Sequence, residues 1–168
     1  MTTIEEISPD HFPLVATWLS EPRINRWLSA EWRCRLVTST TVAMAVRNRR
    51  NRLYLVRYKN KACGLTALAD IDTADSTAMV WYFLGVQALS GKGIMVEAVR
   101  QLVRKAFTEF TLHSIYAWVM EDNAASIRLL EKVGFRQAGR IRGATVSADH
   151  RVDRIYFDLL AYDCAQTQ

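Results

Sequence analysis

Two short segments of the sequence carry residues whose types and spacing suit an anion site. The first, Ser90-Gly91-Lys92-Gly93, follows an apolar run typical of a strand and leads into a helical pattern that starts at Ile94. Glycines in such a turn allow successive backbone amides to point the same way, and the N-terminus of the following helix adds positive potential. The segment lacks the spacing of the G-x-x-x-x-G-K-S/T and G-x-G-x-x-G nucleotide motifs. A purely structural turn is therefore the alternative for this segment taken alone.

The second segment is Asn123-Ala124-Ala125-Ser126, which opens a predicted helix that ends before Gly134. Asparagine is a favoured N-cap because its side chain accepts a hydrogen bond from the first turn, and glycine suits the left-handed residue after a helix. Each residue thus has a structural role of its own. Their arrangement is more informative, because an anion loop at one strand end is followed, after the next strand, by a capped helix.

The elements that must position these segments follow from the hydrophobic period. Helical spacing predicts helices over Pro9–Ser20 and about Ala30–Asn48, separated by a loop at Glu21–Ser29. The period then changes to that of strands. Three consecutive antiparallel strands are predicted, with a hairpin turn at Lys59-Asn60-Lys61 between the first two. They cover Leu53–Tyr58, Ala62–Ala69 and Thr77–Val86.

The second half of the chain alternates helices and strands. We expect a helix over Ile94 to about Phe110, a strand at His113–Met120, a helix at Asn123–Lys132, and strands near Phe135–Val146 and Arg151–Leu160. A strand–helix–strand succession implies a right-handed crossover and a parallel strand pair. The predicted fold class is therefore α/β, with a mixed, mostly antiparallel sheet of about six to seven strands, one locally parallel splayed pair, and about four helices.

Length and composition fit one folded unit. The chain has 168 residues, half of them apolar and 23% charged, and no linker divides it, so we expect a single domain over residues 1–168. We find no apolar run long enough to cross a membrane, and Glu5 and Glu6 stand where a signal peptide carries positive charge. We expect a cytoplasmic protein with no membrane partner. The scattered Cys34, Cys63 and Cys164 predict buried thiols rather than disulfides or a metal site.

The excess of basic over acidic residues is compatible with an anionic partner. Its net charge is +5, and 17 of its 22 basic residues are arginine, which favours phosphates and carboxylates. Basic residues gather between Arg47 and Lys61, and a nucleic-acid module built on them would bind with steep salt dependence. Because this segment straddles a predicted helix, strand and turn, we favour a solvated surface and do not expect a nucleic-acid partner.

Taken in order, the two motifs resemble those of the GNAT acetyltransferases, and of their RimJ/RimL-type branch, which contains ribosomal-protein N-terminal acetyltransferases. Ser90 to Met95 is similar to the family's acetyl-CoA pyrophosphate loop, and Glu97-Ala98 to its following helix. Asn123-x-x-Ser126, with Leu130-Glu131-Lys132-x-Gly134-Phe135, is similar to its second hallmark. The resemblance is strongest from Ala78 to Leu160. It implies the GNAT fold and direct transfer of an acetyl group from acetyl-CoA to a primary amine.

The resemblance also implies a set of cofactor-binding residues. The strand ending at Leu84-Gly85-Val86 would present main-chain groups to the pantetheine arm, and one of its amides would stabilise the oxyanion. Ser90 and Met95 depart from the usual loop pattern, so backbone amides and Lys92 would bind the diphosphate. The full set is Leu84, Gly85, Val86, Ser90, Gly91, Lys92, Gly93, Ile94, Met95, Asn123, Ser126, Leu130 and Lys132.

The catalytic candidates that the resemblance implies are Ser126 and Asn123. Many relatives carry a tyrosine donor at the position of Leu130, so Ser126 is expected to donate to the leaving thiolate. Relatives often place glutamates where this chain has Met79 and Trp118, so no general base is assigned and water-mediated proton removal is favoured. The remaining carboxylates near the expected cleft are Asp70, Asp72, Glu121, Asp122 and Asp153.

The identity of the acceptor stays open at this stage. Trp27, Trp81 and Tyr82 are expected to wall its pocket, although such aromatics are also typical of a core. Six arginines disfavour a polyamine and favour an amine carried on an anionic group: Arg23, Arg26, Arg140, Arg142, Arg151 and Arg154. The stretch from Glu109 to Asp163 is weakly similar to nucleotide-linked amino-sugar acetyltransferases. The alternatives are a peptide or protein N-terminal α-amine, and a non-catalytic acetyl-CoA-binding protein. A homodimer is possible in each case.

Overall fold

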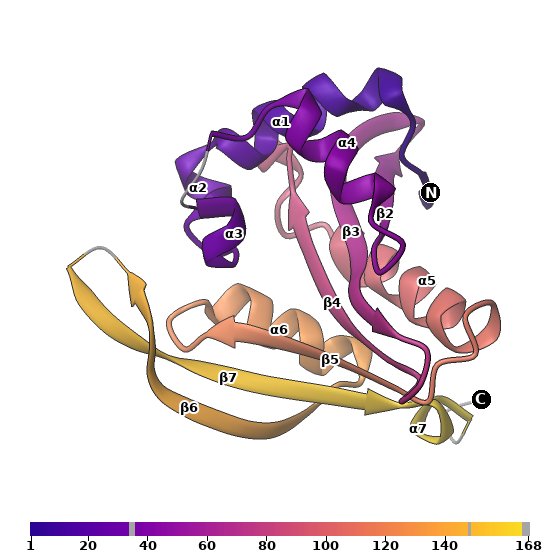
Figure 1. The fold of residues 1–168 in the computed structure, drawn as a ribbon, viewed down its shortest axis with the longest axis vertical. Coiled ribbons are helices and arrows are strands. Elements are labelled where there is room, and N and C mark those ends of the chain that lie inside the picture. The colour runs from indigo at the N-terminus through magenta and orange to yellow at the C-terminus, as the bar shows by residue number, and fades with distance from the viewer. Residues whose placement is uncertain (34–35, 148, 166–168) are drawn as a thin grey trace.

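In the part of the chain that the structure describes, seven strands form one sheet in the order β1-β2-β3-β4-β5-β7-β6 (Figure 1). The computed structural model describes residues 1–33, 36–147 and 149–165. The strands are β1 (Thr2–Glu6), β2 (Arg52–Tyr58), β3 (Lys61–Asp72), β4 (Thr77–Leu84), β5 (Ser114–Met120), β6 (Arg136–Ser147) and β7 (His150–Leu160). Only the β4–β5 pair is parallel among these neighbours, so the predicted mixed, mostly antiparallel α/β sheet is confirmed.

Helices cover both faces of the sheet. In the described residues they are α1 (Phe12–Ser20), α2 (Pro22–Asn25), α3 (Ala30–Arg33), α4 (Ser39–Arg47), α5 (Ile94–Thr108), α6 (Ala124–Val133) and α7 (Ala161–Ala165). The first four pack on one face of β2 to β4, whereas α5 and α6 pack on the opposite face of the sheet. Within the described ranges, no helix combines the length and apolar character needed to cross a bilayer.

The N-terminal third differs most from the sequence-based prediction. Strand β1 was not predicted, because four of its five residues are polar and its strand conformation depends on pairing with β2. The single helix predicted over Ala30–Asn48 is interrupted: α4 begins only after Thr38, whose side chain accepts a hydrogen bond from the Thr41 amide at 3.3 Å. Positions 34–35 of that predicted helix lie outside the described residues. The expected loop at Glu21–Ser29 contains α2, which starts at Pro22.

Two local predictions are confirmed, and a third is confirmed in the part that the structure describes. Lys59 and Asn60 form the β2–β3 turn with φ values of 48° and 65°. Gly134 ends α6 with φ 113°, a left-handed conformation that suits glycine. Cys63 is a buried free thiol, whereas Cys34 and the Cys164 side chain lie outside the described residues.

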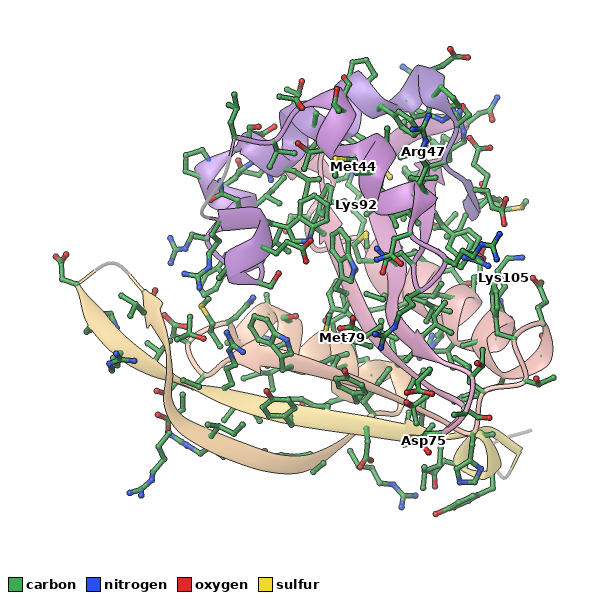
Figure 2. All side chains as sticks on the ribbon, viewed as in Figure 1. Met44, Arg47, Asp75, Met79, Lys92 and Lys105 are labelled. Atoms are coloured by element: carbon green, nitrogen blue, oxygen red, sulfur yellow. The ribbon has the colours of Figure 1, made fainter. Side chains whose placement is uncertain are left out.

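The pairing of β4 with β5 is short. It covers only three register pairs, the last of which joins Met79 to Tyr116 (Figure 2 labels Met79). Beyond that point β4 stays with β3 as far as Leu84, while β5 stays with β7 as far as Met120. The two strands therefore splay. The sequence that follows each strand soon enters a helix, so the N-termini of α5 and α6 lie at the open end of this gap (Figure 1).

Gly64 on β3 lies beside this gap at a point where β4 leaves no room for a side chain. A substitution at this position tests how tightly the two strands pack. A Cβ there would lie 2.5 Å from the Phe83 carbonyl oxygen on β4, a backbone atom that cannot rotate away. Gly64→Ala is expected to lower the free energy of unfolding by about 1–3 kcal/mol, measured by urea titration. Gly139→Ala is the control, because no atom lies within 4 Å of its added methyl group. Equal urea midpoints for the two variants would contradict this account of Gly64.

Candidate active site

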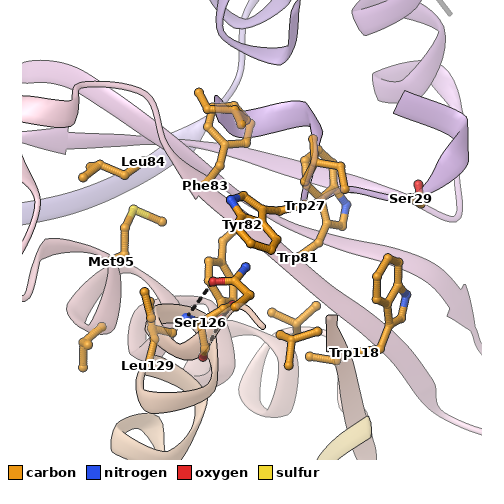
Figure 3. Close-up of a pocket in the computed structure, with 18 of the residues that line it drawn as sticks. Trp27, Ser29, Trp81, Tyr82, Phe83, Leu84, Met95, Trp118, Ser126 and Leu129 are labelled. Carbon is orange, nitrogen blue, oxygen red and sulfur yellow. Dashed lines mark hydrogen bonds between the residues drawn. The ribbon is translucent and has the colours of Figure 1, made fainter. Parts of the chain in front are cut away.

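A cavity of about 570 Å³ occupies the gap between β4 and β5 (Figure 3). Residues 79–84 of β4 and 117–119 of β5 form its sides. Residues 89–96, which include the glycine loop and the first turn of α5, close one end, and the first turns of α6 lie next to them. The site thus brings together the two segments that the sequence analysis singled out.

The glycine loop is built to leave backbone amides unpaired. Gly91 and Gly93 have φ values of 77° and 72°, and no atom lies within 4 Å of the position of an added Cβ at either residue. The first helical hydrogen bond runs from the Glu97 amide to the Gly93 carbonyl at 3.1 Å, so the amides of residues 94–96 have no helical acceptor. Lys92 lines the cavity here, together with Arg128 and Lys132 from α6. Unpaired amides at a helix start, with Lys92 in the same loop and two further cations in the cavity lining, suit a phosphate group.

The backbone just after β4 forms hydrogen bonds within the protein. The amides of Gly85 and Val86 both donate to the Cys63 carbonyl, at 2.7 and 3.1 Å, and the Val86 carbonyl accepts from the Leu89 amide at 3.1 Å. Gly85 also packs against Trp18, since an added Cβ would lie 2.4 Å from its ring. Neither Gly85 nor Val86 is among the residues that line the cavity. These amides complete the sheet in this structure, so the contact of Gly85 and Val86 with the cofactor stays a prediction.

The free edge of β4 lies at Tyr82 and Leu84, three residues and one residue before Gly85. Because Gly85 bonds to Cys63 on β3, the alternation of an antiparallel ladder turns the backbone groups of Tyr82 and Leu84 away from β3, toward the gap. Strand β5 no longer pairs with β4 at this level. Arg23 donates to the carbonyls of Leu84, at 3.2 Å, and Gly85. The Leu84 amide is thus left facing the gap as a hydrogen-bond donor.

Ser126 lies at the start of α6 and contacts β4. Its amide donates to Oδ1 of Asn123 at 3.2 Å, which confirms Asn123 as the N-cap. Its Oγ lies 2.7 Å from the hydroxyl of Tyr82, and that hydroxyl donates to the Ser126 carbonyl at 3.3 Å (Figure 3). Burial raises the pKa of Tyr82 above its ordinary value, so the phenol stays protonated. A pair of neutral hydroxyls therefore faces the cavity.

Leu130 does not reach this site. It is fully buried in the core formed by α5, α6 and the sheet, and it does not line the cavity. Leu129 lines the cavity instead. The contact between Leu130 and the cofactor stays a prediction, and the burial of this side chain gives it no support. Both leucines lie within one helical turn of Ser126, so spacing alone did not distinguish them.

The aromatic residues divide between the two faces of β4. Trp81 points toward α3, where its ring centroid lies 5.4 Å from that of Trp32. Trp27 also lines the cavity, with the Arg26 guanidinium 4.2 Å from its ring centroid. Tyr82 points to the opposite face, toward α6, because side chains alternate along a strand. The predicted wall of Trp27, Trp81 and Tyr82 thus lines one cavity from two sides.

Most of the predicted carboxylates are engaged elsewhere. Glu121 and Asp153 both bind Arg140, and Asp153 also accepts from the Gly143 amide at 2.7 Å. These contacts, the Gly143 amide first, lower the pKa of Asp153.

Asp72 accepts from the amides of Asp75 and Ala74, which lower its pKa. Of the five predicted carboxylates only Asp70 lines the cavity, and Asp122 does not. Asp70 has φ 51° at an irregularity of β3, where the register with β4 shifts. Glu31 also lines the cavity, but the sequence analysis did not consider it because nothing local marks this residue of α3.

The predicted arginines are largely paired within the protein. Arg23 contacts Glu21 at 2.7 Å as well as the β4 backbone, and Arg154 lies 4.1 Å from the Trp118 ring centroid. Of the six named in the sequence analysis, only Arg23 lines the cavity. None of the basic residues between Arg47 and Lys61 is among those that line the cavity, although Asn48 and Asn51 are. Arg47 is exposed at the end of α4 (Figure 2), and Arg57 contacts Glu5 on β1 at 2.6 Å.

Comparison with known proteins places this site in a family. The profile described as "Acetyltransferase (GNAT) domain" matches residues 2–136. The chain therefore belongs to the GNAT acetyltransferase family, and the RimJ/RimL-type resemblance is consistent with its relatives. The "Probable N-acetyltransferase YjcK" of Bacillus subtilis is 53% identical over 66 residues, 39% of this chain and 36% of that protein. The "Putative ribosomal N-acetyltransferase YdaF" of the same organism is 31% identical over 104 residues, 61% of this chain and 56% of that protein.

The chain thus matches about a third to just over half of the length of these two curated relatives. A solved structure shares the fold: the spermidine N-acetyltransferase from Vibrio cholerae in complex with CoA and spermine has a TM-score of 0.84 at 16% identity, over 96% of each chain. The fold expected from the resemblance is confirmed.

The role of the glycine loop in cofactor binding can be tested by placing a side chain in it. Gly93→Glu places a side chain and a negative charge at the amides of the α5 start, so we expect the affinity for CoA to fall at least about tenfold by calorimetry. Gly143→Glu is the matched control, because Gly143 also has a left-handed φ of 57° but lies on β6, away from the cavity. Both variants are expected to lose about 1–2 kcal/mol of stability from backbone strain. Equal CoA affinities would remove the loop from the binding site.

Proposed function

We propose that this protein is an acetyl-CoA-dependent N-acetyltransferase that acts on a primary amine. The observation that carries the proposal is the meeting, in one cavity, of an open strand edge, a row of unpaired amides and a neutral hydroxyl pair. Family membership supports the same activity. Acetyl-CoA, when bound, supplies the activated acetyl group.

The lining residues fit the parts of that molecule. The amides around Gly93, with Lys92, Arg128 and Lys132, suit its diphosphate. The backbone of Tyr82 and Leu84 at the β4 edge offers amide hydrogen bonds of the kind that a pantetheine arm can form with an open strand. This alignment would bring the thioester beside Ser126 and the amide of Leu84.

Two donors would then stabilise the reaction. The Leu84 amide is placed to donate to the oxygen that becomes negative as the amine attacks, and the Ser126 hydroxyl to donate to the leaving sulfur. Direct transfer is favoured because the described part of the cavity lining contains neither cysteine nor histidine. Ser126 itself has the Tyr82 hydroxyl as its side-chain partner rather than a base that would activate it as a nucleophile.

The ammonium group of the acceptor must lose a proton before attack. Asp70 and Glu31 are the carboxylates that line the described cavity, so we propose that one of them receives this proton through water. Trp27, Trp32 and Trp81 surround the same side and suit a flat or apolar carrier.

The proposed acceptor is a nucleotide-linked amino sugar or another small amine, and a peptide or protein N-terminus is the alternative. The name of YdaF points to ribosomal protein, and spermine is bound in the Vibrio cholerae structure. The test is an acceptor screen with labelled acetyl-CoA that compares amino-sugar nucleotides, N-terminal peptides and polyamines. Label transfer to one class identifies the acceptor. Tight CoA binding without transfer to any amine would support a non-catalytic acetyl-CoA-binding protein instead.

Removing the Ser126 hydroxyl should slow turnover more than it weakens binding. Ser126→Ala is expected to reduce kcat at least about tenfold, because one hydrogen bond to a developing anion is lost. The dissociation constant for CoA should change less than about threefold, measured by calorimetry beside the steady-state rates. Ser147→Ala on β6, outside the cavity, is the control. A kcat equal to that of the unmodified protein would exclude Ser126 from the mechanism.

A further inference from the structure

The Tyr82–Ser126 contact joins two elements that the sheet itself does not join. Tyr82 is on β4 and Ser126 on α6, on the α5–α6 side of the gap. We propose that Tyr82 is a positioning residue that turns the Ser126 hydroxyl toward the leaving sulfur. The proposal rests on the proposed function and assigns Tyr82 a role other than that of an aromatic wall.

Two hydrogen bonds, one to the amide and one to the carbonyl, fix the backbone of Ser126. Oδ1 of Asn123 accepts the hydrogen bond of its amide at 3.2 Å, and its carbonyl accepts from the Tyr82 hydroxyl at 3.3 Å. The Tyr82 hydroxyl also lies 2.7 Å from Ser126 Oγ, a distance typical of a good hydrogen bond between hydroxyls. Tyr82 itself lies opposite Thr66 on β3, within the β3–β4 pairing.

The two hydroxyls have two possible proton arrangements. Each hydroxyl carries one hydrogen, whereas the Ser126 carbonyl only accepts. If Tyr82 donates to that carbonyl, the Ser126 hydrogen points back to the tyrosine oxygen. If Tyr82 donates to Ser126 Oγ, the Ser126 hydrogen is free for a third atom in the cavity. A sulfur that gains negative charge favours the second arrangement, because hydrogen bonds to an anion are stronger than those between neutral groups.

Transfer of the acetyl group requires no proton from the Tyr82 and Ser126 hydroxyls. The amine nitrogen bonds to the acetyl carbon, the carbon–sulfur bond breaks, and its electron pair stays on the sulfur as a thiolate. The excess proton on nitrogen leaves to water or a carboxylate, and the thiolate later takes a proton from solvent. An ordinary thiol pKa is about 8.5, below that of tyrosine, and burial raises the pKa of Tyr82 further. The pair therefore donates hydrogen bonds and keeps its protons.

Removing the Tyr82 hydroxyl tests the proposal by kinetics. Tyr82→Phe is expected to lower kcat about tenfold with an unchanged CoA dissociation constant, since only the orientation of Ser126 is lost. In the Ser126→Ala background the same substitution should change kcat less than about twofold, because Tyr82 acts through Ser126. Tyr54→Phe is the matched control: Tyr54 is a buried tyrosine on β2 outside the cavity. An unchanged kcat, or an equal loss in both backgrounds, would overturn the proposal.

A second readout does not depend on turnover. The ultraviolet absorbance of the thiolate, followed against pH, gives the thiol pKa of CoA bound to the protein. We expect it below the value for free CoA, and about one pH unit higher in Tyr82→Phe than in the unmodified protein. An unshifted thiol pKa in the unmodified complex would overturn the proposal without any variant. If CoA binds and its thiol pKa depends on Tyr82, but no amine is acetylated, the proposed function fails while the role of Tyr82 stands.

Discussion

The site depends on how briefly β4 and β5 pair. Three register pairs join them, and each strand then continues with its other neighbour. A strand edge exposes amides and carbonyls that seek partners, and buried polar groups of this kind are costly unless they are satisfied. Within the buried part of a sheet, such an opening would leave backbone amides and carbonyls without partners and lower the stability. Here it lies where α5 and α6 both begin, so the unpaired edge and two helix N-termini converge on one cavity.

The parts of the site with local signals could be predicted from the sequence. The glycine loop, the Asn123 cap and the Gly134 stop each depend on a few neighbouring residues, and the order of strands and helices followed from their period. The parts that depend on distant contacts could not. The Gly85 and Val86 amides are occupied by Cys63, more than twenty positions earlier. Strand β1 exists because β2 pairs with it.

The orientation of Tyr82 follows from the alternation of side chains along a strand, a pattern that was present in the sequence but was not used to predict the site. Side chains alternate along a strand, so Trp81 and Tyr82 must point to opposite faces of β4. Treating them as one aromatic wall relied on residue type alone. The alternation places Trp81 with Trp32 on the α1–α4 side and Tyr82 with Ser126 on the other. Residues that are adjacent in sequence thus line the two sides of the gap, and on the proposed function a single strand would contribute to the binding of both substrates.

Net charge proved a poor guide to the charge inside the cavity. Of the arginines that make the chain basic, Arg140 is paired with carboxylates outside the cavity, and Arg23, at its wall, is held by Glu21 and the β4 backbone. Lys92 lies in the glycine loop, which closes one end of the cavity, whereas Asp70 lies next to the level of Met79, and Met79 is about 16 Å from Leu84 along β4. A charged group acts most strongly on the nearest part of a bound molecule, because the Coulomb energy falls with distance. On the proposed function, an anionic diphosphate at one end and a cationic amine at the other would leave the acetyl group between them. The polarity of the cavity would then orient both substrates without a strongly charged surface.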